Sequence, residues 1–199
     1  MSGPPPTPRQ IVESLLFAAD EPLSARRLAA LIDEATPGLV ADVVRELNAD
    51  YLREARAFHV QEVAGGYRLV TRPEYAGWVA EMRASGATPR LSQAALETLS
   101  IVAYKQPVTR AELESIRGVA VEGVLKTLVD RGLVRVAGRE EGLGRPLLYG
   151  TTDHFLEYFG LSSLDALPRP DELEILFADR ERQQELPLDD GEGITGEDA

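Results

Sequence analysis

From Leu91 to Gly160 the apolar residues recur every three or four positions in three successive segments, as in amphipathic helices. Ser92 is placed to cap the first of these helices, whose apolar face is Leu96, Leu99, Val102 and Ala103. Pro107 then interrupts the pattern, and Thr109 with Glu112 forms a capping box that starts the second helix. The third helix carries its apolar residues at i, i+3, i+4 and i+7, which are Val121, Val124, Leu125 and Leu128.

Two segments that are typical of β-strands follow the third helix, VRVAGR and LLYGTT, separated by a Gly-rich loop. Gly132, just before them, suits the left-handed residue that ends a helix. Three helices followed by a β-hairpin form the winged-helix variant of the helix-turn-helix. The loop lacks the Gly-Lys-Ser/Thr ending of a phosphate-binding loop and lies between two strands, so we interpret it as the wing.

The N-terminal half shows the same order of elements. Helical periodicity begins near Arg9, Ser24 can cap a second helix, and Thr36-Pro37 supplies the N-cap and first position of a third. The second helix is expected to bury Leu28 and Leu31. The segment FHVQEVAGGYRLVT then predicts a hairpin with its turn at Gly65-Gly66, followed by one more helix from Arg72 to Ala84.

The two halves also align locally. Residues 13–28 match residues 97–113 with one inserted residue, which pairs Pro22-Leu23-Ser24 with Pro107-Val108-Thr109. We therefore predict a mainly helical α+β fold of two tandem winged-helix domains, related by duplication. The predicted parts are a disordered N-terminus (residues 1–8), a first domain (9–84), a linker (85–90), a second domain (91–160) and a largely disordered acidic tail (161–199).

Composition narrows the class of protein. The net charge of the chain is −12, and residues 161–199, with twelve acidic and three basic side chains, carry most of it. Residues 90–160, with nine of each kind, are neutral. The absence of cysteine removes disulfides and thiolate chemistry and favours a reducing cytoplasm. The N-terminus has no apolar signal segment, and no apolar run approaches the roughly 20 residues that span a bilayer.

Residues that carry catalysis or bind metals are sparse. The two histidines, His59 and His154, fall in different predicted domains, and no carboxylates stand at chelating spacing. No metal and no cofactor are therefore expected. No Ser/His/Asp order suggests a catalytic triad, so we do not expect an enzyme.

DNA binding through the third helix of the second domain is the alternative function, that of a winged-helix transcriptional regulator. Major-groove readout favours Arg, Asn or Gln, with basic groups for the phosphates. The exposed positions of this helix are instead Glu122, Gly123, Lys126, Thr127 and Asp130. Direct DNA binding is therefore expected to be weak or absent, although Arg139 and Arg145 of the wing can contact either a DNA backbone or an acidic partner.

Dense short motifs distinguish the second half: Ala103-Tyr104-Lys105-Gln106-Pro107, Thr109-Arg110-Ala111-Glu112, Ile116-Arg117-Gly118-Val119, Gly144-Arg145-Pro146, Leu148-Tyr149-Gly150-Thr151-Thr152 and Phe159-Gly160-Leu161. In these residues the stretch from Leu96 to Pro168 resembles bacterial segregation and condensation protein B, ScpB, an accessory subunit of the SMC condensin. The resemblance implies no catalytic activity and a homodimer formed by the N-terminal domains. It further implies that the C-terminal winged helices hold the kleisin ScpA, which bridges the SMC heads during chromosome condensation and partitioning.

The turn and the wing of the second domain are the expected kleisin contact, because an aromatic beside exposed polar groups is a common protein-contact pattern. The predicted residues are Tyr104, Lys105, Gln106, Pro107, Arg110, Arg117, Arg145, Pro146 and Tyr149. Arg110, Glu112 and Arg117 can alternatively form an internal salt-bridge set.

The first domain carries more apolar residues than one stripe per helix would bury, and such an excess marks an interface. We therefore predict that two copies of the chain pair through this domain. The predicted dimer residues are Leu16, Phe17, Leu31, Ile32, Leu39 and Val40.

Overall fold

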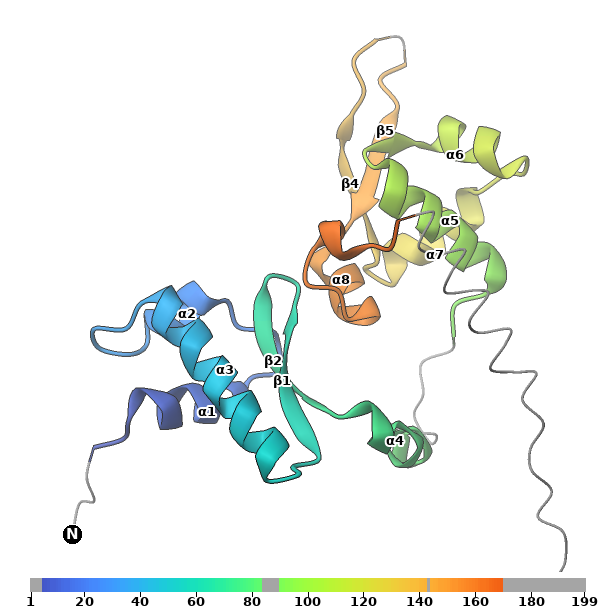
Figure 1. The fold of residues 1–199 in the computed structure, drawn as a ribbon. Helices are drawn as coiled ribbons and strands as arrows, with labels where there is room; N and C mark the ends of the chain where they lie inside the picture. Colours follow the sequence, from blue (N-terminus) through green and yellow to red (C-terminus); the bar gives the residue numbers. More distant parts are fainter. Residues whose placement is uncertain (1–4, 84–89, 143, 170–199) are drawn as a thin grey trace, which may run out of the picture. The chain divides into compact units, whose positions relative to one another are not determined.

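The first half of the chain is a winged helix of three helices and a hairpin (Figure 1). The computed structural model describes residues 5–83, 90–142 and 144–169. The elements of the first half are α1 (Pro8–Ala18), α2 (Ala25–Ala29), α3 (Pro37–Arg53), β1 (Phe58–Val63), β2 (Gly66–Thr71), η1 (Pro73–Tyr75) and α4 (Ala76–Arg83). The expected last helix of this half therefore starts with a 3-10 turn.

The second half repeats the arrangement and adds a short third strand. Its elements are α5 (Gln93–Lys105), β3 (Val108–Thr109), α6 (Arg110–Arg117), α7 (Glu122–Asp130), β4 (Val134–Arg139), β5 (Leu147–Thr151), α8 (Asp153–Phe159) and η3 (Leu164–Ala166). The predicted fold class, two tandem winged helices, is confirmed. Most of the predicted linker and of the acidic tail lies outside the described residues.

Helix starts follow the capping signals in the sequence. The side-chain oxygens of Ser24, Thr36 and Ser92 each accept a hydrogen bond from the backbone N–H three residues on, at 3.2, 3.2 and 3.3 Å. Thr109 forms the predicted capping box with Glu112. A further capping box, centred on Thr7, was not predicted, and because of it α1 begins one residue earlier than expected.

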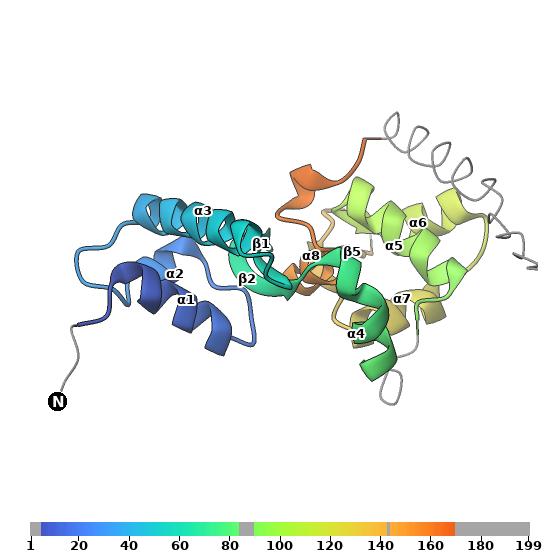
Figure 2. The same cartoon turned by 60° about the horizontal axis from the view of Figure 1, so that its bottom comes forward.

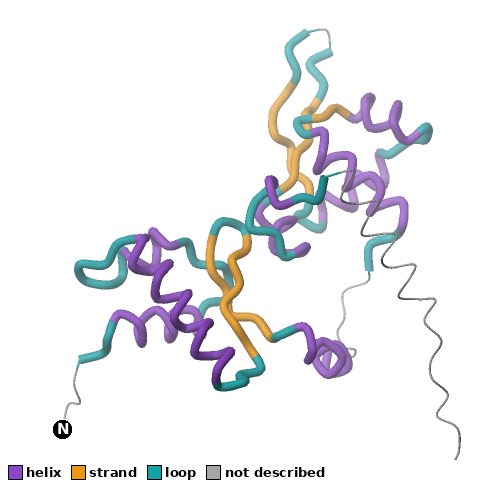
Figure 3. Tube along the Cα trace, in the orientation of Figure 1, coloured by secondary structure: helices purple, strands orange, loops and turns teal. Residues whose placement is uncertain are grey.

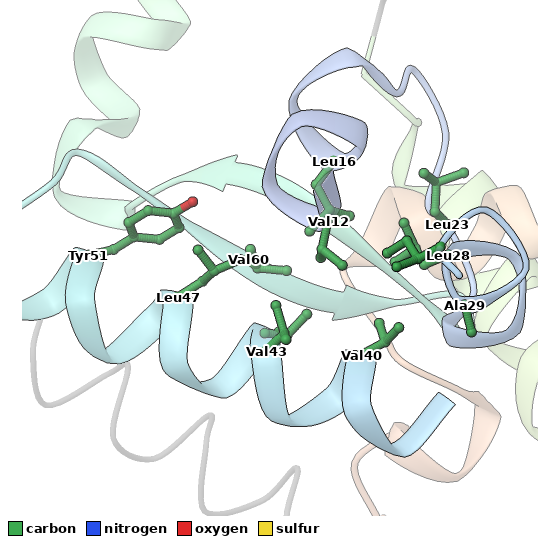
Figure 4. Close-up of a cluster of buried hydrophobic side chains, with 12 residues drawn as sticks. Val12, Leu16, Leu23, Leu28, Ala29, Val40, Val43, Leu47, Tyr51 and Val60 are labelled. Carbon is green, nitrogen blue, oxygen red and sulfur yellow. The ribbon is translucent and has the colours of Figure 1, made fainter. Parts of the chain in front are cut away.

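The core of the first winged helix lies between α1, α3 and the hairpin (Figures 2 and 4). Val12 and Leu16 of α1 point toward Val40, Val43 and Leu47 of α3, and all five side chains are buried. Full burial of a Val or Leu side chain contributes about 1.5–3 kcal/mol. Because α2 and β1 also contact α3, this helix is the centre of the first core.

The segment after α2 differs from its prediction. The second helix was expected to bury Leu31, but α2 ends at Ala29 and the chain then turns. Leu31 is consequently 60% exposed, whereas Ile32 is only 7% exposed and joins the core. The helical spacing failed here because it was extended two residues past the end of the helix.

The buried face of α5 is also rotated from its predicted position. Leu99, Val102 and Ala103 are buried as expected, but Leu96 is partly exposed and Thr98 is buried in its place. The hydroxyl of Thr98 donates a hydrogen bond to the backbone carbonyl of Ala94 at 2.9 Å. This internal bond satisfies the hydroxyl, so a polar residue can occupy a core position.

The turn of the first hairpin lies one residue earlier than predicted. β1 and β2 pair so that Val63 faces Gly66, which leaves Ala64 and Gly65 as the two turn residues. Both have positive φ, 49° and 68°, as a type I′ turn requires. The strands of this hairpin are the paired orange segments of the first half in Figure 3.

Gly66 has a different role, because the chain before α2 passes directly over it. Leu23 bridges to Tyr67 through two backbone hydrogen bonds of 3.0 and 2.9 Å. A Cβ at Gly66 would lie 2.9 Å from the backbone carbonyl carbon of Leu23. Only glycine therefore allows this close approach without a shift of the backbone.

The sheet of the second half repeats this bridge. Its strand order is β3-β5-β4, and Val108 of β3 faces Tyr149 of β5. Val108 is the residue that aligns with Leu23, so Tyr67 and Tyr149 hold equivalent positions on the second strand of each hairpin. The shared bridge supports the inference that the two halves arose by duplication.

Candidate partner-binding surfaces

A hollow of about 270 Å³ lies where the start of α6 meets the start of β5. Its lining residues are Arg110, Ala111, Pro146, Leu147 and Tyr149. The β3–β5 pairing creates this neighbourhood, because β3 runs directly into α6 and holds it beside β5. The hollow is mostly apolar, with one cationic side chain and one phenol, which is a composition suited to protein recognition.

Three of the predicted kleisin residues, Arg110, Pro146 and Tyr149, come together in this hollow. The hollow also contains Ala111 and Leu147, which are not among the predicted residues. Leu147 is two residues from Tyr149 on β5, so strand alternation places both side chains on one face and was the available signal. Ala111 gave no such signal, because a small residue in a first helical turn is common.

The one cationic side chain of the hollow, Arg110, has two carboxylates nearby. The guanidinium of Arg110 lies 3.4 Å from a Glu122 oxygen and 3.9 Å from a Glu114 oxygen. Glu112 is occupied elsewhere, since it accepts hydrogen bonds from the backbone N–H and the hydroxyl of Thr109, both at 2.8 Å. The Thr109 backbone N–H, followed by its hydroxyl, holds the pKa of the Glu112 carboxyl below its ordinary value.

Gln106 has its side chain turned inward and does not line this hollow. Its amide nitrogen donates to the backbone carbonyl of Ala103 and to the hydroxyl of Thr151, at 3.1 and 3.0 Å. Its amide oxygen accepts from the backbone N–H of Thr151 at 2.8 Å. Gln106 therefore ties the end of α5 to β5, and it borders a separate hollow of about 480 Å³ with Arg135 and Leu164.

Arg117 is likewise engaged within the fold. Its guanidinium pairs with Glu97 of α5, and its side chain is only 16% exposed. The alternative of internal salt bridges thus describes Arg117, and Arg110 in part, but Glu112 caps α6 through Thr109 and forms no ion pair with either arginine. Tyr104, Lys105, Pro107 and Arg145 are exposed but do not line the hollow at α6.

The third helix of the second half, α7, presents few groups that read DNA. Glu122 projects into solvent at its start, and the hydroxyl of Thr127 donates within the helix to the Gly123 carbonyl at 3.0 Å. Lys126 is exposed between these residues. The surface of α7 thus carries the mixed charges that its sequence indicates.

The predicted dimer residues divide into two groups. Leu16, Ile32 and Val40 are buried in the core of the first winged helix, so their side chains are not available to a partner. Phe17, Leu31 and Leu39 are exposed, with Phe17 exposed by 80% beside a hollow of about 320 Å³. Further exposed apolar residues that the prediction did not include are Leu52, Trp78 and Met82.

Within the described ranges, no three His, Asp or Glu side chains gather closely enough to hold a metal ion. No helix of the described part of the chain has the length and apolar character to cross a membrane.

The chain is similar in sequence to many known proteins. Residues 10–170 match the family model described as "Segregation and condensation complex subunit ScpB". Segregation and condensation protein B of Syntrophotalea carbinolica is 52% identical over 160 residues, which cover 80% of each chain. The Moorella thermoacetica protein of the same name is 50% identical over 177 residues, covering 89% of this chain and 88% of its own.

A solved structure described as the dimer of an ScpB N-terminal domain complexed with an ScpA peptide is also similar. It is 36% identical to this chain, covers 37% of this chain and 91% of its own, and gives a TM-score of 0.34.

Proposed function

The chain belongs to the ScpB family of segregation and condensation complex subunits, and from this premise we propose that it is a non-catalytic scaffold of the bacterial SMC condensin. In this role it binds the kleisin ScpA with the second winged helix and pairs with a second copy through the first. Through ScpA it joins SMC on the nucleoid, in the cytoplasm, and takes part in chromosome condensation and segregation. Direct DNA contact contributes little to this role.

The hollow at α6 and β5 is the observation that carries the ScpA proposal. It offers an aromatic ring, a proline, a leucine and an alanine around one arginine, Arg110. Interfaces concentrate their binding energy in such pockets, where aromatic and Arg residues are enriched. Tyr104, Lys105 and Arg145 are exposed on the same winged helix, and we assign them to the rim of the contact.

Ala111→Glu tests the proposal with little risk to the fold. Ala111 is exposed in the first turn of α6, where a carboxylate favours the helix N-terminus. In the hollow, the same carboxylate would occupy the space that a partner side chain needs and would lose its hydration on binding. We expect the affinity for ScpA, measured by isothermal titration calorimetry with the full chain, to fall at least tenfold.

Ser115→Glu is the matched control, since it adds the same charge to an exposed position of α6 that does not line the hollow. It should bind ScpA as the wild-type chain does. Equal affinity for all three proteins would move the ScpA contact away from this hollow.

The dimer proposal rests on the exposed apolar residues of the first winged helix. Replacing Phe17 and Leu31 together by serine removes apolar surface without touching the core. We expect the dimer dissociation constant, measured by sedimentation equilibrium, to rise about tenfold or more, because buried aromatic anchors dominate interfaces. Leu52→Ser, at a similarly exposed residue outside the predicted set, should leave it unchanged. A monomeric wild-type chain, or a double variant that pairs normally, would contradict the proposal.

A further inference from the structure

The hollow at α6 and β5 contains one charge that the fold does not hold firmly. The side chain of Arg110 is 51% exposed, and its two acidic neighbours lie at 3.4 and 3.9 Å. Charge-assisted N–H···O bonds are normally about 2.7–2.9 Å long, so neither contact is a well-formed one. The other arginine of α6, Arg117, is by contrast largely buried against Glu97.

The two carboxylates beside Arg110 have different roles. Glu114 accepts a hydrogen bond from the backbone N–H of Val121 at 3.2 Å, which fixes it in the turn between α6 and α7. Glu122, at the start of α7, has an 80% exposed side chain. An exposed ion pair of this kind contributes little to stability, because water screens it and two long side chains lose freedom. Glu122 is therefore the neighbour that can be displaced.

The other residues that line the hollow determine which chemical group could replace Glu122 beside Arg110. Ala111, Pro146, Leu147 and the ring of Tyr149 accept an apolar side chain, while Arg110 at the border accepts a carboxylate. Charge and apolar surface are thus complementary to a peptide segment that carries both groups. A nucleic-acid phosphate would satisfy Arg110 but would leave the apolar walls without a partner and would face Glu122.

We propose that the Arg110–Glu122 ion pair is an exchange site, at which a carboxylate of an acidic, apolar-containing segment of the partner replaces Glu122 on Arg110. The inference rests on the proposed function, in which this partner is ScpA. Glu122 is then a built-in competitor that lowers the affinity of the free hollow. The apolar side chain of the same segment enters the hollow beside Tyr149.

If Glu122 competes with ScpA for Arg110, removing the charge of Glu122 should strengthen ScpA binding. Glu122→Gln in the full chain is expected to tighten ScpA binding about twofold to fivefold, as the loss of an exposed ion pair allows. Arg110→Gln should weaken binding about tenfold, because a charge-assisted contact is lost. In the double variant, Glu122→Gln should have no further effect, since no guanidinium remains to be released.

Glu54→Gln supplies the control for the change in net charge. Glu54 forms an exposed pair with Arg56 in the first winged helix, at 2.9 Å, so the variant removes the same charge in a comparable setting. It should leave the affinity for ScpA at the wild-type value.

The proposal of an exchange site would be wrong if Glu122→Gln left the affinity for ScpA unchanged. It would also be wrong if the substitution raised this affinity equally in the wild-type and Arg110→Gln backgrounds. It would also be overturned if Glu122→Gln strengthened binding to fragmented genomic DNA instead. If Arg110→Gln weakened ScpA binding by the full chain but not by a chain ending at residue 169, the acidic tail would be the occupant and the assignment to the partner would be refuted. A wild-type chain that does not bind ScpA would refute the proposed function itself, which is a different result.

Discussion

Gly66→Ala is expected to lower the free energy of unfolding of the first winged helix by about 2–4 kcal/mol. The new Cβ would lie 2.9 Å from the carbonyl carbon, 3.0 Å from the oxygen of Leu23 and 3.1 Å from the Ser24 nitrogen. These are backbone atoms, so no side-chain rotation relieves the clash. Overpacking of this kind costs about 1–3 kcal/mol, and loss of the Leu23–Tyr67 hydrogen bonds adds about 1 kcal/mol.

Urea unfolding, followed at backbone amides by NMR, measures this effect in the first winged helix separately from the second. Gly123→Ala is the control, because Gly123 lies within α7 and a Cβ there meets nothing within 4 Å. It should raise the stability of the second winged helix by up to about 1 kcal/mol, since alanine favours helix. A Gly66→Ala chain within about 0.5 kcal/mol of wild type would show that the strands part without cost, contrary to the prediction.

Local signals predicted most helix starts correctly, because the groups involved are three residues apart in the sequence. The capping box of Thr109 and Glu112 is one example, and the N-caps at Ser24 and Ser92 are others. Each satisfies backbone N–H groups that the helix itself leaves unpaired, whatever the rest of the chain does. Such features can be predicted before any tertiary contact is known.

Features that depend on distant residues were predicted less well. The close passage of Leu23 over Gly66 joins segments more than forty residues apart, and without it Gly66 looks like a turn residue. The exposure of Leu31 follows from the point at which α2 ends, which periodicity does not specify. In both places tertiary packing, and not local preference, decides the outcome.

At the candidate site, too, local motifs were informative, whereas contacts between distant residues were not predicted. Sequence motifs marked Arg110, Pro146 and Tyr149 without indicating that they meet, since β3–β5 pairing is needed to bring them together. The same short motifs also suggested Gln106 and Arg117 as contact residues. Their partners, Thr151 and Glu97, lie far away in the sequence. The sequence left an internal salt bridge open for Arg117 without indicating Glu97, and it gave no sign of the internal role of Gln106.

Gln106→Leu should accordingly reduce stability before it affects any partner, by about 2–3 kcal/mol in the second winged helix. The change leaves the buried backbone N–H of Thr151 without its acceptor, and an unsatisfied buried donor costs about 1–3 kcal/mol. Lys105→Leu is the matched control at the adjacent exposed position and should stay within about 0.5 kcal/mol of wild type. Urea unfolding gives both values. If Gln106→Leu kept wild-type stability and yet lost ScpA binding, Gln106 would be a contact residue and its inward role would be wrong.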